Sequence, residues 1–190
     1  GAIDHLVEGD PSNLSTDIGP IIDDEARSKL LHHIQDLEGT AHHISKSPYN
    51  ENLDAYGTYI PAIIAEIRDC DELTEEAVGP ILHIIRYKES EIEALIQSMN
   101  AKGYGLTFGL HSRIHTKQDR ISKLVNAGNL YINRGQTGAV VGVQPFGGRG
   151  LSGTGPKAGG PHYLHAFATE KTISNDITAC GGNATLVNLD

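Results

Sequence analysis

The residues best suited to chemistry lie in one glycine-rich stretch, residues 129–163. After a short apolar strand it is dominated by Gly, Pro, Ser and Thr, so regular structure is not expected there. A flexible linker is one interpretation, but glycine linkers carry few bulky residues, and this stretch contains Val140, Val141, Val143 and Phe146. We therefore expect a loop that packs against the protein while its backbone closely approaches a ligand.

The glycines of this stretch do not follow a phosphate-binding pattern. Residues 147–150 and 153–155 follow no strand directly and open no helix, and the Lys-Ser/Thr ending of a P-loop is absent. Glycines can instead expose backbone N–H groups toward a small anion, such as a carboxylate, in a concave turn. Residues 135–139 and Gly142 are the candidates for that role, and a glycine-rich turn that only packs is the alternative.

Ten histidines invite a metal hypothesis. The adjacent pairs at positions 32–33 and 42–43 diverge on a helix or a strand, so neither pair can hold one ion. His111 and His115 have helical spacing, but a strand is expected around His111 and the Glu of a zinc-protease helix is missing. We therefore predict ordinary surface or core histidines and no metal site.

The two cysteines are poor candidates for a nucleophile, which needs an electropositive setting and a base. Cys70 lies among Asp69, Asp71 and Glu72, whose charges should raise its pKa. Cys180 lies in a small-residue run near the end of the chain, without a basic neighbour. We expect neither thiol to be catalytic.

Composition excludes several classes of function. With 38% hydrophobic and 21% charged residues, the 190-residue chain is typical of a globular protein. Its net charge of -9 argues against a nucleic-acid surface. The apolar runs are far too short to cross a membrane, residues 1–10 lack a signal-peptide pattern, and the two cysteines suit a reducing compartment. We expect a cytoplasmic location.

Alternating helix and strand patterns predict an α/β fold around the glycine-rich stretch. A helix should begin after the N-cap Asp23 and stop at Gly39. Strands are expected over residues 59–67, where Pro61 marks an edge or a strand start, and over residues 81–87, 104–112 and 130–132. Helices capped by Ser90 and Thr116 separate the last three strands. This order predicts right-handed crossovers in a mostly parallel sheet with flanking helices.

The last part of the chain is expected to serve assembly. Residues 161–166 suit a short helix, and residues 168–177 alternate as a strand does. An apolar terminal strand with no obvious partner either joins an edge of its own sheet or pairs with another subunit. We therefore divide the chain into residues 1–167 and an oligomerisation strand and tail, residues 168–190, which should form a homo-oligomer.

Several motifs together resemble the aldehyde dehydrogenase superfamily. Residues 75–80, Glu-Glu-Ala-Val-Gly-Pro, are similar to its Glu-x-Phe-Gly-Pro motif, and residues 145–153 contain its Pro-Phe-Gly-Gly and Ser-Gly elements. The opening Gly-Asp-Pro and Leu-Ser-Thr-Asp-Ile-Gly-Pro also agree with it. The longer run over residues 138–161 and residues 178–183 is most similar to the 1-pyrroline-5-carboxylate dehydrogenase branch, in the form found in bacterial bifunctional proline utilisation A.

The resemblance implies a role for particular residues. Glu76 would bind the hydroxyls of the nicotinamide-side ribose of NAD, a task suited to a carboxylate that accepts two O–H bonds, and Val78 would lie beside the cofactor. Gly138 and Ala139 would donate N–H groups to the α-carboxylate of glutamate semialdehyde, and Phe146 would flank its carbon chain. Residues 134–160 would thus be a substrate-anchoring loop. The implied reaction is NAD-dependent oxidation of this aldehyde to glutamate.

Two departures from the family pattern shape the expectation. Val78 replaces the usual Phe, so an aromatic contact to the cofactor is lost. The family's nucleophilic Cys, its oxyanion-hole Asn and its dinucleotide-binding glycines have no counterpart here, so no catalytic residue is assigned. The sequence thus resembles the C-terminal part of a catalytic domain, expected to bind no NAD and to be inactive alone. A non-catalytic oligomerisation module and a small-carboxylate-binding module are the alternatives.

Overall fold

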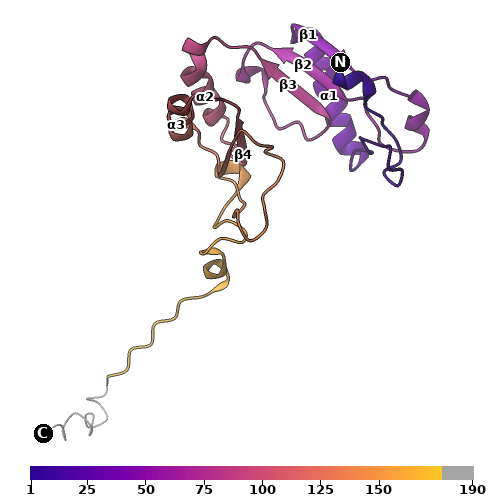
Figure 1. Ribbon diagram of the computed structural model, residues 1–190. Coiled ribbons are helices and arrows are strands. Elements are labelled where there is room, and N and C mark those ends of the chain that lie inside the picture. The colour runs from indigo at the N-terminus through magenta and orange to yellow at the C-terminus, as the bar shows by residue number, and fades with distance from the viewer. Residues whose placement is uncertain (177–190) are drawn as a thin grey trace, which may run out of the picture.

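The computed structural model describes residues 1–176, which form two α/β lobes and an extended terminal segment (Figure 1). The first lobe contains helix α1 (Asp24–Thr40) and strands β1 (His43–Lys46), β2 (Ile63–Ile67) and β3 (Ile81–Ile85). Strand β2 lies in the middle of this sheet, antiparallel to β1 and parallel to β3. Ile63 pairs with Ile81 and Ala65 with His83, so these side chains share one face.

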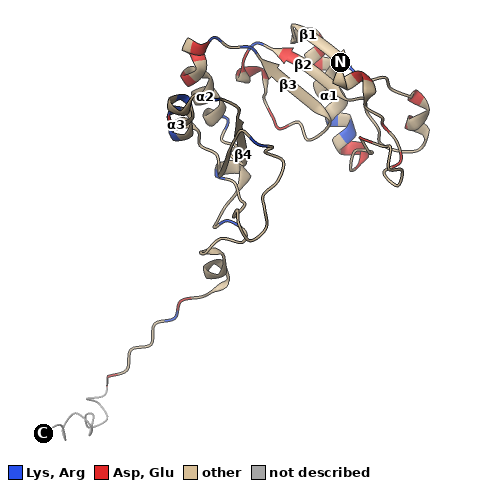
Figure 2. Cartoon of the chain, viewed as in Figure 1, with Lys and Arg blue, Asp and Glu red and all other residues tan. Residues whose placement is uncertain are grey.

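Helix α1 forms where local signals predicted it. The Asp23 carboxylate accepts a hydrogen bond of 2.7 Å from the Ala26 N–H, which satisfies one of the unpaired donors of the first turn. The buried face of the helix packs on alternate residues of β2, which lie below 10% exposure. The cluster comprises Leu30, Ile34, Leu37, Ile60, Ile63, Ala65 and Ile67. Acidic and basic residues both occur along α1 (Figure 2), and Lys29 pairs with Glu25 at 2.7 Å.

Two details of the first lobe were not settled by the sequence. Pro61 lies just before β2, so it marks a strand start rather than a sheet edge. Strand β1 was not expected, because its four residues contain only one apolar side chain, Ile44. It forms because its backbone completes the ladder on the open side of β2.

The second lobe contains α2 (Ile92–Ala101), β4 (Thr107–Leu110), α3 (His115–Leu124) and β5 (Asn129–Ile132). Strands β4 and β5 are parallel, and α3 is the crossover between them. The core is formed by Ile92, Ile96, Leu110 and Ile121. Neither expected cap is used: Ser90 lies inside a single 3-10 turn (Glu89–Glu91), and α3 begins one residue before Thr116.

The α/β class with mostly parallel strands is confirmed, but the expectation that these strands share one sheet is wrong. Within residues 1–176 they form a three-stranded and a two-stranded sheet, and β3 does not pair with β4. Alternating patterns identify strands and helices, but they contain no information on which strand edges meet. The short elements between them are 3-10 turns at Ala2–His5, Glu51–Ala55, Cys70–Glu72, Gly150–Ser152 and Tyr163–Phe167.

The terminal segment extends away from both lobes (Figure 1). The helix expected at residues 161–166 is present as the 3-10 turn Tyr163–Phe167. Residues 168–176 are exposed and form no ladder with the rest of the described chain, so pairing with an edge of their own sheets is not observed. Ile177, Cys180 and the motif at residues 178–183 lie outside the described residues. No helix in residues 1–176 is long and apolar enough to cross a membrane.

Candidate functional site

Glu76 and Val78 lie on the connection between the 3-10 turn Cys70–Glu72 and strand β3. Both line a cavity of about 470 Å³, which is also lined by Lys29 and His33 of α1. The Glu76 side chain is exposed and forms no hydrogen bond or ion pair with any residue in 1–176. Val78 is 74% exposed. The structure therefore presents a free carboxylate beside an apolar side chain at the mouth of this cavity.

A second cavity, of about 720 Å³, adjoins the first. Glu75, Glu76, Ala77 and Tyr104 line both cavities. The second cavity continues along the apolar surface of the second lobe, where its lining includes Leu95, Ile96, Met99, Leu106, Phe108 and Val125. Glu76 thus stands where a cavity of mixed polar and apolar lining meets a more apolar one.

A histidine pair connects helix α1 to strand β3 at this junction. The Nε2 atoms of His33 and His83 are 2.9 Å apart, and the rings meet edge to face with centroids 5.1 Å apart. His33 lines the first cavity and His83 the second. Burial, together with the charge of His33, lowers the pKa of His83. One neutral ring therefore donates and the other accepts.

The glycine-rich loop, residues 134–160, divides into a packed part and an open part. The packed part contains Phe146, half-buried, whose backbone exchanges two hydrogen bonds with Ala158 at 3.1 and 2.9 Å. Two of its glycines, Gly148 and Gly153, pack too closely for a side chain: a Cβ on Gly153 would lie 2.4 Å from the Gly148 carbonyl oxygen. This part of the loop is therefore a packed turn.

The open part contains Gly138 and Ala139. No atom lies within 4 Å of the place where a Cβ on Gly138 would stand. Within residues 1–176, the N–H groups of Gly138 and Ala139 donate to no other atom. The next N–H, that of Val140, is taken by the Gln144 side chain at 2.9 Å. Two consecutive unpaired donors therefore remain available to an anion.

The structure brings the predicted residues together in two groups. Glu76 and Val78 share the first cavity, whereas Gly138, Ala139 and Phe146 share the loop and line neither of the two cavities. Sequence reasoning missed the side chains that hold the loop, Asn129, Arg134, Gln144 and Lys157. One signal was available in the sequence: every charged residue from 120 to 169 is basic.

The described cysteine has no setting for nucleophilic chemistry. Cys70 is 5% exposed, and burial raises the pKa of its thiol. The neighbouring carboxylates, which the sequence suggested as the cause, contribute less than burial, and Ser98 and Lys102 partly offset it. Among residues 1–176, no group of three or more His, Cys, Asp or Glu side chains could hold a metal ion.

Comparisons with known proteins agree on one family. The family model described as aldehyde dehydrogenase matches residues 2–173. Bifunctional protein PutA of Klebsiella aerogenes is 44% identical over 175 residues, which are 90% of this chain and 13% of that protein. A crystal structure of a proline utilization A variant from Bradyrhizobium japonicum has a TM-score of 0.81 at 48% identity, over 90% of this chain and 17% of that one.

A third relative is a crystal structure of 1-pyrroline-5-carboxylate dehydrogenase from Thermus with bound NAD. It has a TM-score of 0.73 at 33% identity, over 87% of this chain and 31% of that one. The chain thus spans less than a third of the length of these three relatives. The matches confirm both the resemblance expected from the motifs and the α/β class. The chain belongs to the aldehyde dehydrogenase family.

Proposed function

We propose that this chain is the substrate-anchoring part of an NAD-dependent 1-pyrroline-5-carboxylate dehydrogenase, which oxidises L-glutamate semialdehyde to L-glutamate in proline catabolism. The observation that carries the proposal is the pair of unpaired N–H groups at Gly138 and Ala139. The relatives named PutA and 1-pyrroline-5-carboxylate dehydrogenase support the choice of substrate. The second of these names indicates a substrate with a carboxylate, which these donors could bind.

The electrostatics of the loop favour an anionic ligand. The charged residues of 120–169 are Arg120, Lys123, Arg134, Arg149 and Lys157, with no acidic residue among them. The same absence of acidic side chains is visible along the loop in Figure 2. In a chain of net charge -9, this segment is a local positive region that attracts a carboxylate. Phe146, half-buried at the base of the loop, would flank the aliphatic part of the substrate.

The residues around Glu76 fit a ribose. A free carboxylate can accept hydrogen bonds from both ribose hydroxyls, and Val78 offers an apolar surface beside it. The nicotinamide supplies an acceptor for the hydride that leaves the substrate carbon. Glu76 would orient the ribose at the cavity mouth, and water would supply the second oxygen of the glutamate carboxylate. The Thermus relative was crystallised with NAD, which supports the same cofactor here.

The chain by itself should be inactive. The family reaction passes through a thiolate, and Cys70 is buried with a raised pKa. We expect purified chain to form no NADH from pyrroline-5-carboxylate and NAD. Turnover that is lost on Cys70→Ser would contradict this expectation.

A chimera tests the proposal directly. Residues 1–176 would replace the aligned segment of Klebsiella PutA, and NADH formation would be measured with pyrroline-5-carboxylate and with propanal, which lacks a carboxylate. We expect turnover that strongly prefers pyrroline-5-carboxylate. Glu76→Gln in the chimera should raise the KM for NAD about tenfold, because one charge-assisted hydrogen bond contributes about 1.5–3 kcal/mol. The neighbouring Glu75→Gln is the matched control. A folded chimera without preference for pyrroline-5-carboxylate would refute the substrate assignment.

Residues 168–176 are proposed to pair with another subunit. They are exposed and make no ladder in the described chain, and Ile173 is 77% exposed. Light scattering should show an oligomer for the full chain and a monomer after truncation at Phe167. Equal masses for the two forms would refute this role.

A further inference from the structure

Arg134 makes a set of contacts that converge on one turn of the glycine-rich loop. Its Nη1 donates to Gln144 Oε1 at 2.8 Å, its Nη2 to the Gly138 carbonyl at 3.3 Å, and its Nε to the Gly135 carbonyl at 3.2 Å. Gln144 Oε1 also accepts the Val140 N–H at 2.9 Å. Arg134 and Gln144 together therefore hold both ends of the segment 138–140.

These contacts fix the two peptide planes on either side of Ala139. A trans peptide unit is planar, and its C=O and N–H point in opposite directions. Because Arg134 holds the Gly138 carbonyl, the Ala139 N–H of the same unit must point away from the guanidinium. Because Gln144 holds the Val140 N–H, the following plane is fixed as well. The direction of the Ala139 donor is thus set by two side chains that a ligand at this N–H need not touch.

Arg134 is itself held by the second lobe. Its guanidinium carbon lies 4.7 Å from the ring centroid of Tyr131 on β5, a distance typical of a cation–π contact. Tyr131 is 5% exposed, so the ring is a fixed platform. The Gln136 side chain lies against Gly109 of β4 nearby, since a Cβ on Gly109 would lie 2.6 Å from its Oε1. Gly109 is the register partner of Tyr131 in the β4–β5 pair.

We propose that Arg134 is the positioning residue of the carboxylate site, aiming and polarising the Ala139 N–H through the Gly138 carbonyl. This role rests on the function proposed above. A cation on the carbonyl oxygen withdraws electron density from the peptide unit, which strengthens its N–H as a donor. The positive charge also lowers the electrostatic cost of an anion at this turn. Arg134 does this without being a catalytic residue.

The test uses the full chain labelled with ¹⁵N, with L-glutamate as the probe and 1,4-diaminobutane as a probe without carboxylates. Glutamate should shift the Gly138 and Ala139 amide resonances saturably, and the diamine should not. Arg134→Lys should weaken glutamate binding about fivefold to tenfold. Lysine keeps the charge but lacks the planar guanidinium, which donates to Gln144 Oε1 and the Gly138 carbonyl oxygen at once. Arg134→Met should weaken it further and should shift the Ala139 resonance in the absence of ligand.

Arg149→Met is the matched control. It removes one positive charge from the same loop, but the Arg149 side chain contacts Asn126 at 3.4 Å and not the turn. Glutamate affinity should change less than twofold in this variant. Wild-type resonances that do not respond to glutamate would overturn the proposed function and this role with it. Wild-type binding that persists unchanged in both Arg134 variants would overturn this role alone.

Discussion

Asn129 and Gly147 lie 18 residues apart in the sequence and are joined by a hydrogen bond of 3.1 Å from the Gly147 N–H to Asn129 Oδ1. Asn129 is buried at the start of β5. Its Nδ2 donates to the Pro145 carbonyl at 3.0 Å, and its Oδ1 also accepts from Lys157 Nζ at 3.2 Å. One side chain thus ties the strand to the packed part of the glycine-rich loop.

Replacing this side chain should destabilise the second lobe. Asn129→Leu leaves the Gly147 N–H and the Pro145 carbonyl without a partner in a partly buried place, which should lower the free energy of unfolding by about 2–3 kcal/mol. Urea unfolding followed by circular dichroism measures the change. Asn13→Leu, at an exposed position, is the control and should stay within about 0.5 kcal/mol of wild type. Equal stability of the two variants would contradict the assigned role of Asn129.

The glycines of the loop should differ sharply in their tolerance of a methyl group. A Cβ on Gly153 would lie 2.4 Å from the Gly148 carbonyl oxygen, a backbone atom that cannot move aside cheaply. Gly153→Ala should therefore lower the free energy of unfolding by about 1–3 kcal/mol. A Cβ on Gly155 would meet nothing within 4 Å, so Gly155→Ala should be neutral or slightly stabilising. Thermal unfolding of the two variants side by side checks the contrast, and similar melting temperatures would refute the packing argument.

Local signals predicted the helices better than they predicted the sheets. Helix α1 could be located because an N-cap and an apolar stripe are properties of consecutive residues, and the structure confirms Asp23 as its cap. Strand β1 and the division into two sheets could not be predicted, because pairing depends on edges that are distant in sequence. The exact start of a helix is also poorly determined by residue type: Thr116 was a reasonable cap, but it lies inside α3.

The candidate site was predictable only in part. The motifs named Glu76, Val78, Gly138, Ala139 and Phe146, but their roles stay predictions, since family resemblance assigns a role without placing the residue. The contacts of Arg134 could not be predicted, because they exist only when the loop folds back on β5. The segment free of acidic residues was a second readable sign of an anion site, beside the glycines themselves.

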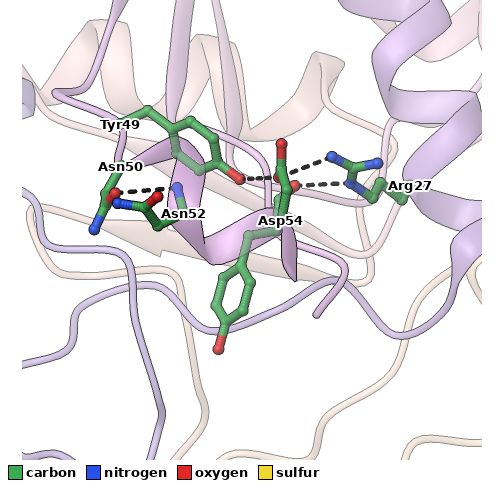
Figure 3. Close-up of polar contacts among 6 residues, drawn as sticks. Arg27, Tyr49, Asn50, Asn52 and Asp54 are labelled. Atoms are coloured by element: carbon green, nitrogen blue, oxygen red, sulfur yellow. Dashed lines mark hydrogen bonds and ion pairs between the residues drawn. The ribbon is translucent and has the colours of Figure 1, made fainter. Parts of the chain in front are cut away.

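The hydrogen bonds around Asp54 should change the titration of Tyr49. Figure 3 shows the Asp54 carboxylate between Tyr49 and Arg27. The Tyr49 hydroxyl donates to Asp54 Oδ1 at 2.6 Å, and Arg27 Nη2 donates to the same oxygen at 3.0 Å. Burial, then the hydrogen bond to Asp54 and its charge, raise the pKa of Tyr49 to about 12. The fold therefore favours the protonated phenol.

The consequence for stability has a definite sign. The raised pKa of Tyr49 contributes stability that is complete below the ordinary tyrosine value of 10.0 and is lost as pH rises toward about 12. Asp54→Asn removes the negative charge, so the pKa of Tyr49 should fall toward its ordinary value, as measured from tyrosinate absorbance. Tyr56→Phe serves as the control, because it shows how much an exposed tyrosine contributes to the tyrosinate absorbance. An unchanged Tyr49 titration in Asp54→Asn would contradict this account.

The His33–His83 pair should make the first lobe sensitive to acid. Burial and the charge of His33 lower the pKa of His83 from 6.5, so the unfolded chain binds this proton more readily than the folded chain. Stability from this source is therefore complete above pH 6.5 and is lost as pH falls through 6.5 toward the lowered value. Protonation of both rings would also break the contact between their Nε2 atoms, because neither ring could then accept.

The comparison that isolates this effect is His83→Gln, whose amide can still hydrogen-bond His33 but does not titrate. Its urea midpoint should fall less than that of wild type between about pH 8 and about pH 5. Lys29, Glu25, Glu75 and Glu76 line the adjoining cavities and are present in both proteins, so their titration cancels in the difference. His5→Gln, which removes an exposed histidine, should follow the wild-type curve. Parallel curves for wild type and His83→Gln would show that the histidine pair does not couple folding to pH.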